Sequence, residues 1–150
     1  PTNTFGPNDK YNTLDSHFFP ALLKKVYNLK INNKNILQIW GNGKVKRELI
    51  YVDDVADACI YFMNKKIREN IINIGTGKDF TINYYAKLLL KKILPKKKTK
   101  IIYDTSKPNG TPRKVLDVSL SYKYGWKASI DINQALKLTI DDYAAKYHNE

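Results

Sequence analysis

The sequence contains a single cysteine, Cys59, in 150 residues, so it cannot form an internal disulfide. This cysteine usage favours a reducing compartment such as the cytoplasm. It has no apolar run of about 18 residues, and we therefore predict no transmembrane helix. The polar segment 1–10 has no apolar centre and is not interpreted as a signal peptide. No cluster of His, Cys, Asp and Glu has metal-ligand spacing, and we expect no metal centre.

Arginine is scarce in a strongly basic chain. The net charge is +12, yet the only arginines are Arg47, Arg68 and Arg113. Lysine, asparagine and isoleucine are abundant together, as an AT-rich coding sequence produces without selection for a ligand. The densest lysine run, 91–100, falls at a predicted helix end, where cations are favoured. A basic nucleic-acid-binding module stays a remote alternative, but the tyrosines do not gather around a basic groove motif. We expect neither a nucleic-acid nor a membrane partner.

Glycine is also scarce, with 7 in the chain. The G-x-G-x-x-G turn that opens a dinucleotide-binding fold is missing. Segment 41–46 has only the first two glycines of that pattern, and segment 75–77 lacks the third. Both segments are typical of turns. A complete cofactor-binding fold is therefore not expected within this chain.

Short apolar strands alternate with amphipathic helices, which predicts an α/β arrangement. The predicted strands are 36–40, 48–52, 71–74 and 101–103. The predicted helices run from Ser16 to about Leu29, from Asp53 or Asp54 onward, from Thr81 to about Leu94, and after a capping box formed by Asp131 and Gln134. Segments 1–15 and 104–114 are predicted to be extended or loop regions.

Apolar residues at helical spacing predict which face of each helix is buried. The predicted faces are Phe19, Leu22, Leu23 and Val26 on the first helix, Val55, Ala58, Cys59 and Phe62 on the second, and Ile132, Leu136, Ile140, Tyr143 and Tyr147 on the last. On this pattern Cys59 is a core residue. Asp53 and Asp54 are more typical of a helix start than of an acid/base pair.

Several motifs occur in the order found in one enzyme family. The opening P-T-N-T-F-G-P of residues 1–7 resembles the P-T-N-x-Y-G-P segment of extended short-chain dehydrogenases/reductases that act on nucleotide sugars. Segments 12–22, 39–43, 47–58, 72–77 and 104–118 resemble, in the same order, blocks of the GDP-L-fucose synthase family. The V-D-D block at 52–54 is shared by many nucleotide-sugar enzymes. The S-H-F-F-P-A-L and S-K-P-N-G-T-P-R-K stretches are the specific ones.

The resemblance implies a fold. The chain would be the C-terminal portion of an extended short-chain dehydrogenase/reductase of Rossmann type, with a small α+β substrate-binding lobe. Residues 1–150 would form a single substrate-binding region, and the N-terminal dinucleotide-binding half would be absent. We therefore expect the chain to be a fragment.

The resemblance also implies an activity. The full enzyme would convert GDP-4-keto-6-deoxy-D-mannose to GDP-L-fucose by 3,5-epimerisation and NADPH-dependent 4-reduction, acting as a homodimer. A Ser-Tyr-Lys centre for hydride transfer would lie upstream, and the missing half would hold most of the NADPH. We therefore expect the fragment alone to be inactive as a reductase.

The resemblance assigns one catalytic residue and a cofactor segment. His17 matches the histidine that acts as acid in epimerisation and also contacts the cofactor. Pro1, Thr2, Asn3 and Thr4 match the segment along the nicotinamide end of NADPH. Without the resemblance, His17 would be interpreted as a capping or packing residue. The other histidine, His148, is expected to be exposed.

Substrate contacts are implied at Lys25, Trp40, Arg47 and Asn109. Lys25 and Arg47 supply cations for a nucleotide diphosphate, and the Trp40 ring can pack on a sugar or base. Asn109 stands where relatives usually have Asp, so it keeps hydrogen bonding but loses a charge-assisted bond. Without the resemblance, Lys25 and Arg47 would be surface cations and Trp40 a core aromatic.

The nearest alternative is another extended enzyme of this type, such as a nucleotide-sugar 4-epimerase or 4,6-dehydratase. Such an enzyme would share the P-T-N and V-D-D blocks but should lack S-K-P-x-G-T-P-R-K. A preference for UDP-sugars over GDP-sugars would favour this alternative.

Overall fold

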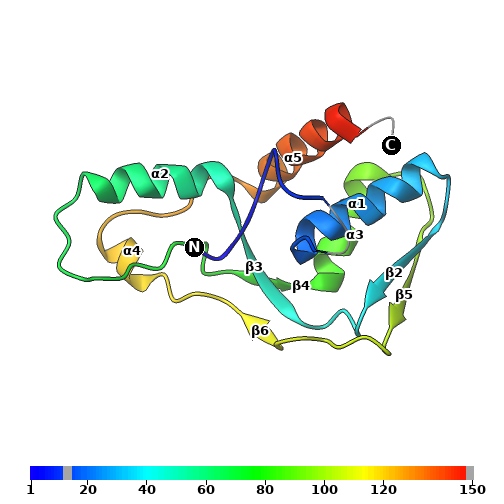
Figure 1. Ribbon diagram of the computed structural model, residues 1–150, viewed down its shortest axis with the longest axis horizontal. Coiled ribbons are helices and arrows are strands. Elements are labelled where there is room, and N and C mark those ends of the chain that lie inside the picture. The colour runs from blue at the N-terminus through cyan, green and yellow to red at the C-terminus, as the bar shows by residue number, and fades with distance from the viewer. Residues whose placement is uncertain (12–14, 148–150) are drawn as a thin grey trace. The chain divides into compact units, whose positions relative to one another are not determined.

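The computed structural model describes residues 1–11 and 15–147 of the chain. The elements follow the order β1 (Asn3–Phe5), α1 (Phe18–Ile31), β2 (Ile36–Trp40), β3 (Lys46–Tyr51), α2 (Val52–Met63), β4 (Asp79–Thr81), α3 (Ile82–Ile93), β5 (Lys100–Asp104), β6 (Arg113–Lys114), α4 (Ser119–Lys123) and α5 (Ile132–Tyr147) (Figure 1). Within these residues, no helix combines the length and the apolar character that crossing a membrane requires.

The chain divides into two compact units. Unit 1 consists of residues 1–9, 48–79 and 115–150, and unit 2 consists of residues 10–47 and 80–114. The boundary falls inside β3, between Arg47 and Glu48, so that one strand begins in unit 2 and ends in unit 1.

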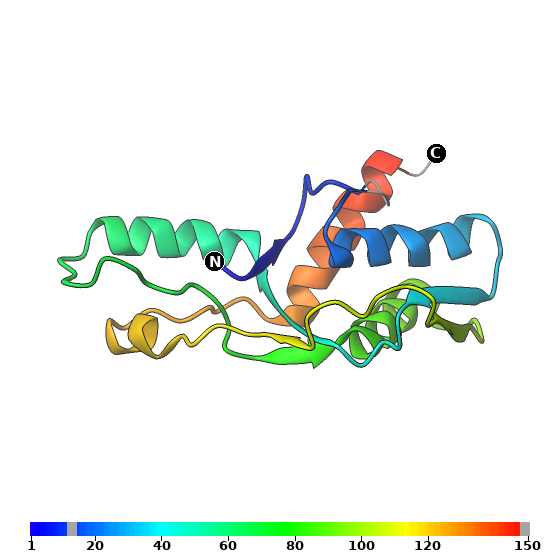
Figure 2. The same ribbon diagram turned by 60° about the horizontal axis from the view of Figure 1, so that its bottom comes forward.

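Unit 1 contains a parallel strand pair followed by a helix. β1 pairs in parallel with the second half of β3, in the register Asn3 to Leu49 and Phe5 to Tyr51. α2 follows β3 directly (Figure 2). Ile50, Ala58 and Trp126 form a buried cluster in this unit. Parallel strand pairs are the signature of α/β folds, so the predicted fold class is confirmed.

Two carboxylates are buried in unit 1. Glu48 is 0% exposed, and its oxygens accept hydrogen bonds from the backbone N–H groups of Thr76 (2.6 Å), Gly77 (2.7 Å) and Leu116 (2.8 Å). A Cβ atom at Gly75 would lie 2.4 Å from Glu48 Oε1, so a larger residue there would displace the carboxylate from these bonds. These bonds replace the water that a buried charge loses.

Asp54 is the second buried carboxylate and is 3% exposed. It accepts hydrogen bonds from the backbone N–H groups of Ser129 (2.9 Å) and Ile130 (3.3 Å). Asp53 is exposed beside it in the first turn of α2. The pair therefore belongs to a helix start, as predicted, and Asp54 additionally ties segment 129–130 to α2.

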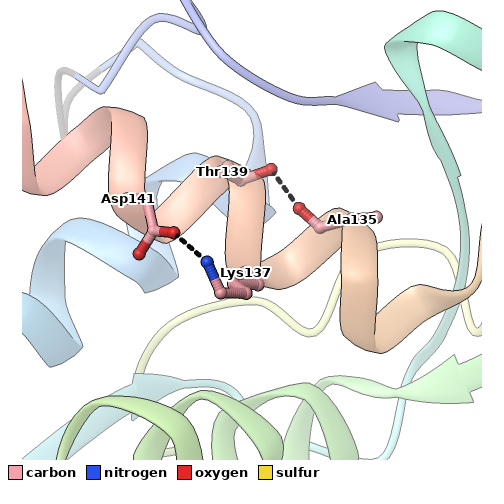
Figure 3. Close-up of polar contacts among 4 residues, drawn as sticks. All are labelled: Ala135, Lys137, Thr139 and Asp141. Atoms are coloured by element: carbon pink, nitrogen blue, oxygen red, sulfur yellow. Dashed lines mark hydrogen bonds and ion pairs between the residues drawn. The ribbon is translucent and has the colours of Figure 1, made fainter.

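Helix α5 shows how one helix carries two kinds of polar contact (Figure 3). On its buried side, the Thr139 hydroxyl donates to the Ala135 carbonyl oxygen at 2.8 Å, which satisfies a polar group in the core. On its exposed side, Lys137 and Asp141 form an ion pair of 2.7 Å one turn apart. The Thr139 bond allows a polar side chain to be buried in the core. The Lys137–Asp141 ion pair is exposed, and exposed ion pairs contribute little to stability.

Unit 2 contains the parallel pair β2–β5, in register from Ile36 opposite Lys100 to Trp40 opposite Asp104, with helices α1 and α3 (Figure 1). β6 pairs in parallel with the first half of β3. Exposure alternates along β2, where Leu37 and Ile39 are buried and Ile36, Gln38 and Trp40 are exposed. Because successive side chains in a strand point to opposite faces, Trp40 is directed out of the core.

Several predictions for unit 2 are confirmed. The strand 36–40 has the predicted bounds, and the predicted face of α1 is buried. α3 begins after Thr81, whose hydroxyl accepts from the Tyr84 N–H at 3.1 Å as a helix cap. Lys91 and Lys92 lie in the last turn of α3, where the dense lysine run was predicted to meet a helix end.

The predicted cap of the first helix is wrong. α1 begins at Phe18 with His17 at the N-cap position, and His17 makes no side-chain capping bond. Ser16, predicted to cap, lies one residue too early, and its hydroxyl is buried with no hydrogen-bond partner among the described residues.

The predicted strand 71–74 is also wrong, because the segment has no regular structure. Strands require a ladder of bonds to a neighbour, whereas here the Thr2 N–H donates to the Ile74 carbonyl oxygen in an isolated bond of 3.0 Å. The short strand β4 forms after it at Asp79–Thr81. Apolar character alone therefore misplaced the strand.

Cys59 is exposed, so its predicted place in the core is wrong. The buried residues of α2 are Asp54 and Ala58, with Val55 and Phe62 partly buried against the same cluster. α2 carries apolar residues on both sides, and its outer side includes Ile60 (64% exposed) and Met63 (84% exposed). The spacing of apolar residues in the sequence therefore could not show which of the two apolar sides of α2 is buried.

The last helix follows its prediction in part. Asp131 Oδ1 accepts from the Asn133 and Gln134 N–H groups, at 2.8 and 3.4 Å, as a helix cap. Leu136 and Tyr143 are buried as predicted, but Ile132, Ile140 and Tyr147 are only partly buried. Ala135 and Thr139 occupy the core face instead. His148 and residues 12–14, which open the family-like block 12–22, lie outside the described residues.

Candidate functional site

Unit 2 contains a cavity of about 310 Å³. Its walls come from α1, β2, the first half of β3, the start of α3 and the loop after β5. Among the lining residues are Ser16, Lys25, Trp40, Arg47 and Asn109. The structure therefore brings together all the residues predicted to contact a substrate. They come from four separate parts of the sequence, so no single motif required them to lie close together.

Lys25 projects from α1 and is half-buried. Its ammonium lies 5.1 Å from the centroid of the Trp40 ring, in a cation–π contact. Burial lowers the pKa of Lys25 from the usual 10.5, because the charged form loses hydration. Among the described residues no carboxylate forms an ion pair with it.

Arg47 occupies the first half of β3. Its Nη1 donates to the carbonyl oxygens of Lys46 and Thr111, each at 2.7 Å. The opposite side of the guanidinium lies against Gly110, where an added Cβ would approach Nη2 to 3.4 Å. Two neutral acceptors fix the group without cancelling its charge, so a positive charge remains at the cavity.

Asn109 has a role in the structure that its sequence position did not reveal. Its Oδ1 accepts from the Asn42 N–H at 2.8 Å. At Gly41 the φ angle is +70°, and a Cβ there would lie 2.5 Å from Asn109 Oδ1. The amide therefore holds the turn after β2 beside the cavity. An aspartate at this position could accept the same bond.

The sequence patterns did not predict the place of Ser16 in the cavity wall or the contact of Lys107 with Trp40. The buried Ser16 hydroxyl lacks a partner in the described chain and lines the cavity, so a polar ligand atom there would satisfy it. The Lys107 ammonium lies 5.8 Å from the Trp40 ring centroid. The S-K-P block was the signal for Lys107, but no pattern connected it with Trp40.

The remaining predicted site residues lie elsewhere. His17 is exposed at the N-cap of α1 and does not line the cavity, although Ser16 and Phe18 on either side of it do. Pro1–Thr4 belong to unit 1. There Asn3 Nδ2 donates to the Glu48 carbonyl oxygen at 2.9 Å, and Thr2 Oγ1 reaches the same oxygen at 3.5 Å.

Comparison with known families decides the classification. The sequence model described as the NAD dependent epimerase/dehydratase family matches residues 1–75, which is half of the chain. The chain belongs to the NAD dependent epimerase/dehydratase family.

Relatives of this epimerase/dehydratase chain are named as synthases of GDP-sugars. It is 38% identical over 143 residues to "Putative GDP-L-fucose synthase 2" of Arabidopsis thaliana, covering 95% of the chain and 43% of that protein. It is 36% identical over 152 residues to "GDP-L-colitose synthase" of Yersinia pseudotuberculosis, covering 100% of the chain and 48% of that protein. The resemblance found in the sequence blocks is thereby confirmed.

A solved structure gives the same family assignment. The crystal structure of a GDP-L-fucose synthetase from Naegleria fowleri bound to NADP matches with a TM-score of 0.86 and 25% identity, covering 99% of this chain and 46% of that one. The chain thus spans about half the length of the relatives it matches.

The name of the epimerase/dehydratase family refers to the dinucleotide NAD. The residues of this chain do not form a complete binding site for such a dinucleotide. The sequence has no G-x-G-x-x-G turn. The Thr2 N–H and the Asn3 amide are already used in bonds within unit 1. Among residues 1–11 and 15–147, no group of three or more His, Cys, Asp and Glu could hold a metal ion.

Proposed function

We propose that this chain is the GDP-sugar-binding part of a GDP-L-fucose synthase-type enzyme. The whole enzyme would epimerise C3 and C5 of GDP-4-keto-6-deoxy-D-mannose and reduce C4 with NADPH, as a homodimer. The observation that carries the proposal is the unit 2 cavity, which gathers Lys25, Trp40 and Arg47 from separate sequence blocks. The names of the relatives support GDP-sugars as the ligand class.

The cavity suits a nucleoside diphosphate sugar on chemical grounds. Within the part of the chain that the structure describes, its lining includes two cations, Lys25 and Arg47, and no Asp or Glu. Phosphate oxygens form strong charge-assisted bonds with such groups. Trp40 is 57% exposed, so a flat or apolar ligand surface can reach its side chain. The Ser16 hydroxyl, which has no hydrogen-bond partner among residues 1–11 and 15–147, adds a polar contact.

His17 is proposed as the acid in epimerisation. Epimerisation removes a proton α to the ketone and returns one to the opposite face, which requires a base and an acid. His17 is exposed and its imidazole does not cap α1, so helix capping does not occupy it. Its position beside Ser16, a cavity-lining residue, supports this role.

Hydride transfer is proposed to depend on residues outside this chain. The spacing Tyr-x-x-x-Lys does occur at Tyr61–Lys65 and Tyr103–Lys107. The Tyr61 hydroxyl, however, donates to the Tyr124 carbonyl oxygen (2.8 Å), and the Tyr103 hydroxyl donates to Asn83 Oδ1 (2.8 Å). We expect NADPH to be bound mainly by the half of the enzyme that this chain does not cover, with Pro1–Thr4 along its nicotinamide end.

Titration calorimetry tests the proposed ligand class. We expect the 150-residue chain to bind GDP and GDP-sugars, to bind UDP at least tenfold more weakly, and to oxidise no NADPH alone. A preference for UDP would instead indicate a nucleotide-sugar 4-epimerase or 4,6-dehydratase. Failure to bind any nucleoside diphosphate would refute the proposal, and NADPH turnover would refute the assignment of hydride transfer to other residues.

A further inference from the structure

Two ammonium groups lie over the Trp40 indole. Lys25 Nζ is 5.1 Å from the ring centroid and Lys107 Nζ is 5.8 Å from it. The three residues come from α1, the end of β2 and the loop after β5. Among the described residues neither lysine forms an ion pair with a carboxylate. Two cations that form no ion pair among the described residues thus lie over the ring.

The backbone fixes Lys107 at this place. The Asp104 carbonyl oxygen accepts from the Lys107 N–H (3.2 Å) and from the Gly41 N–H (2.8 Å), which ties the loop to the residue after Trp40. The Asp104 carboxylate accepts from the Ser106 hydroxyl at 2.5 Å. That bond is the main reason why the pKa of Asp104 is low, and the charge of Lys107 contributes less.

The position of Lys107 gives the cavity a third cation at its rim. The next two residues, Pro108 and Asn109, line the cavity, and Trp40 lines it too. Lys25 and Arg47 already face the space without a carboxylate among the lining residues. The diphosphate of a nucleotide sugar carries about two negative charges, and two cations over an indole with a third lining the same cavity match it.

From this geometry, and resting on the proposed function, we propose that Lys107 is a further substrate-binding residue that leaves the Trp40 ring and binds the diphosphate when a GDP-sugar enters. One ring face cannot hold an ammonium and a base or sugar at once. An exposed cation–π contact is weaker than a charge-assisted bond to phosphate, so the exchange is favourable. Without ligand, the ring keeps the lysine close to where the phosphates arrive.

The experiment compares GDP with guanosine, which has no phosphate, on the full 150-residue chain by calorimetry. Lys107→Gln is expected to weaken GDP binding about tenfold while changing guanosine binding less than twofold. Lys98→Gln is the matched control, because Lys98 is an exposed lysine of the same unit and does not contact Trp40. It is expected to bind both ligands as the unchanged chain does.

Fluorescence gives a second readout on the same variants. Trp40 is 57% exposed and Trp126 only 3%, so acrylamide quenching reports mainly Trp40. GDP is expected to protect Trp40 in the unchanged chain, and Lys107→Gln to raise its quenching before GDP is added. If Lys107→Gln binds GDP within twofold of the unchanged chain, or loses guanosine equally, the role of Lys107 is refuted while the proposed function stands. If the unchanged chain does not bind GDP, the proposed function itself fails.

Discussion

The two units handle charge in opposite ways. Unit 1 buries the carboxylates of Glu48 and Asp54 and surrounds them with backbone N–H groups, so each charge is satisfied within the unit. Unit 2 leaves Lys25 and Arg47 at a cavity that no acidic residue of the described chain lines. A charge that is fully satisfied by its own backbone holds the fold together. A charge without an internal counter-ion is available to a ligand.

The largest expected effect is on the stability of unit 1. Glu48→Ala removes a fully buried side chain and the acceptor of three part-buried N–H groups, and a buried polar group left unsatisfied costs about 1–3 kcal/mol. We expect a loss of about 3 kcal/mol or more in urea unfolding followed by circular dichroism. Glu48→Gln should lose less, because its carbonyl oxygen still accepts the Thr76 and Gly77 bonds.

Asp53→Asn is the matched control for Glu48, since Asp53 is an exposed acid near the start of α2. It should change the unfolding free energy by less than about 0.5 kcal/mol. Equal losses for Glu48→Ala and Asp53→Asn would show that the burial of Glu48 is not what stabilises unit 1.

The next effect is on ligand affinity in unit 2. Arg47→Met removes a cavity cation, and a hydrogen bond to a charged group contributes about 1.5–3 kcal/mol, which corresponds to roughly 10–100-fold in affinity. GDP binding should fall by that factor in calorimetry. The unfolding free energy should fall much less than for Glu48→Ala. A variant that loses stability and affinity together would remove the contrast between the units.

A smaller effect is expected on the pH dependence of binding. Burial lowers the pKa of Lys25, so its ammonium deprotonates at a lower pH than an ordinary lysine. Below that pKa the group is charged and attracts phosphate. As pH rises through it, the charge and part of the GDP affinity are lost. Lys25→Arg should retain affinity to higher pH, because arginine stays protonated. Identical pH profiles for both proteins would exclude Lys25 as the titrating group.

The smallest expected effect concerns the outer side of α2. Because Cys59 is exposed, Cys59→Ser should change the unfolding free energy by less than about 0.5 kcal/mol. Ala58→Leu is the contrasting change, because Ala58 is 0% exposed and overpacking a core costs about 1–3 kcal/mol. A thiol reagent should label Cys59 in the folded chain at a rate close to that in denaturant. Slow labelling would indicate that this side of α2 is covered.

Sequence patterns correctly located the elements in which the spacing of apolar residues fits only one kind of structure with one buried face. β2 alternates strictly and α1 has one apolar side, so both were located correctly. α2 has apolar residues all round, so only the fold reveals that Cys59 faces outward. Segment 71–74 is apolar enough for a strand but lacks a ladder partner, which depends on distant residues.

The candidate site was predictable to the same extent. The order of motifs predicted Lys25, Trp40, Arg47 and Asn109, and the cavity contains them. The contacts that involve Ser16 and Lys107 depend on how loops fold back toward α1 and β2. The spacing of residues in the sequence does not predict such contacts, because the contacting residues are far apart in the chain.

The boundary within β3 has a consequence for how this protein tolerates insertions and deletions. Arg47 and Glu48 are adjacent, yet one lines the cavity and the other is buried in unit 1. Since alternate residues of a strand point to opposite faces, losing or gaining one residue here would exchange their directions. A deletion would bring the Glu48 carboxylate to the place of Arg47 at the cavity, and an insertion would bring the guanidinium to the buried place of Glu48. Either change would remove both residues from their present contacts, so ligand binding and folding would be lost together. An insertion or deletion in this strand therefore cannot change ligand binding without also changing the stability of the fold.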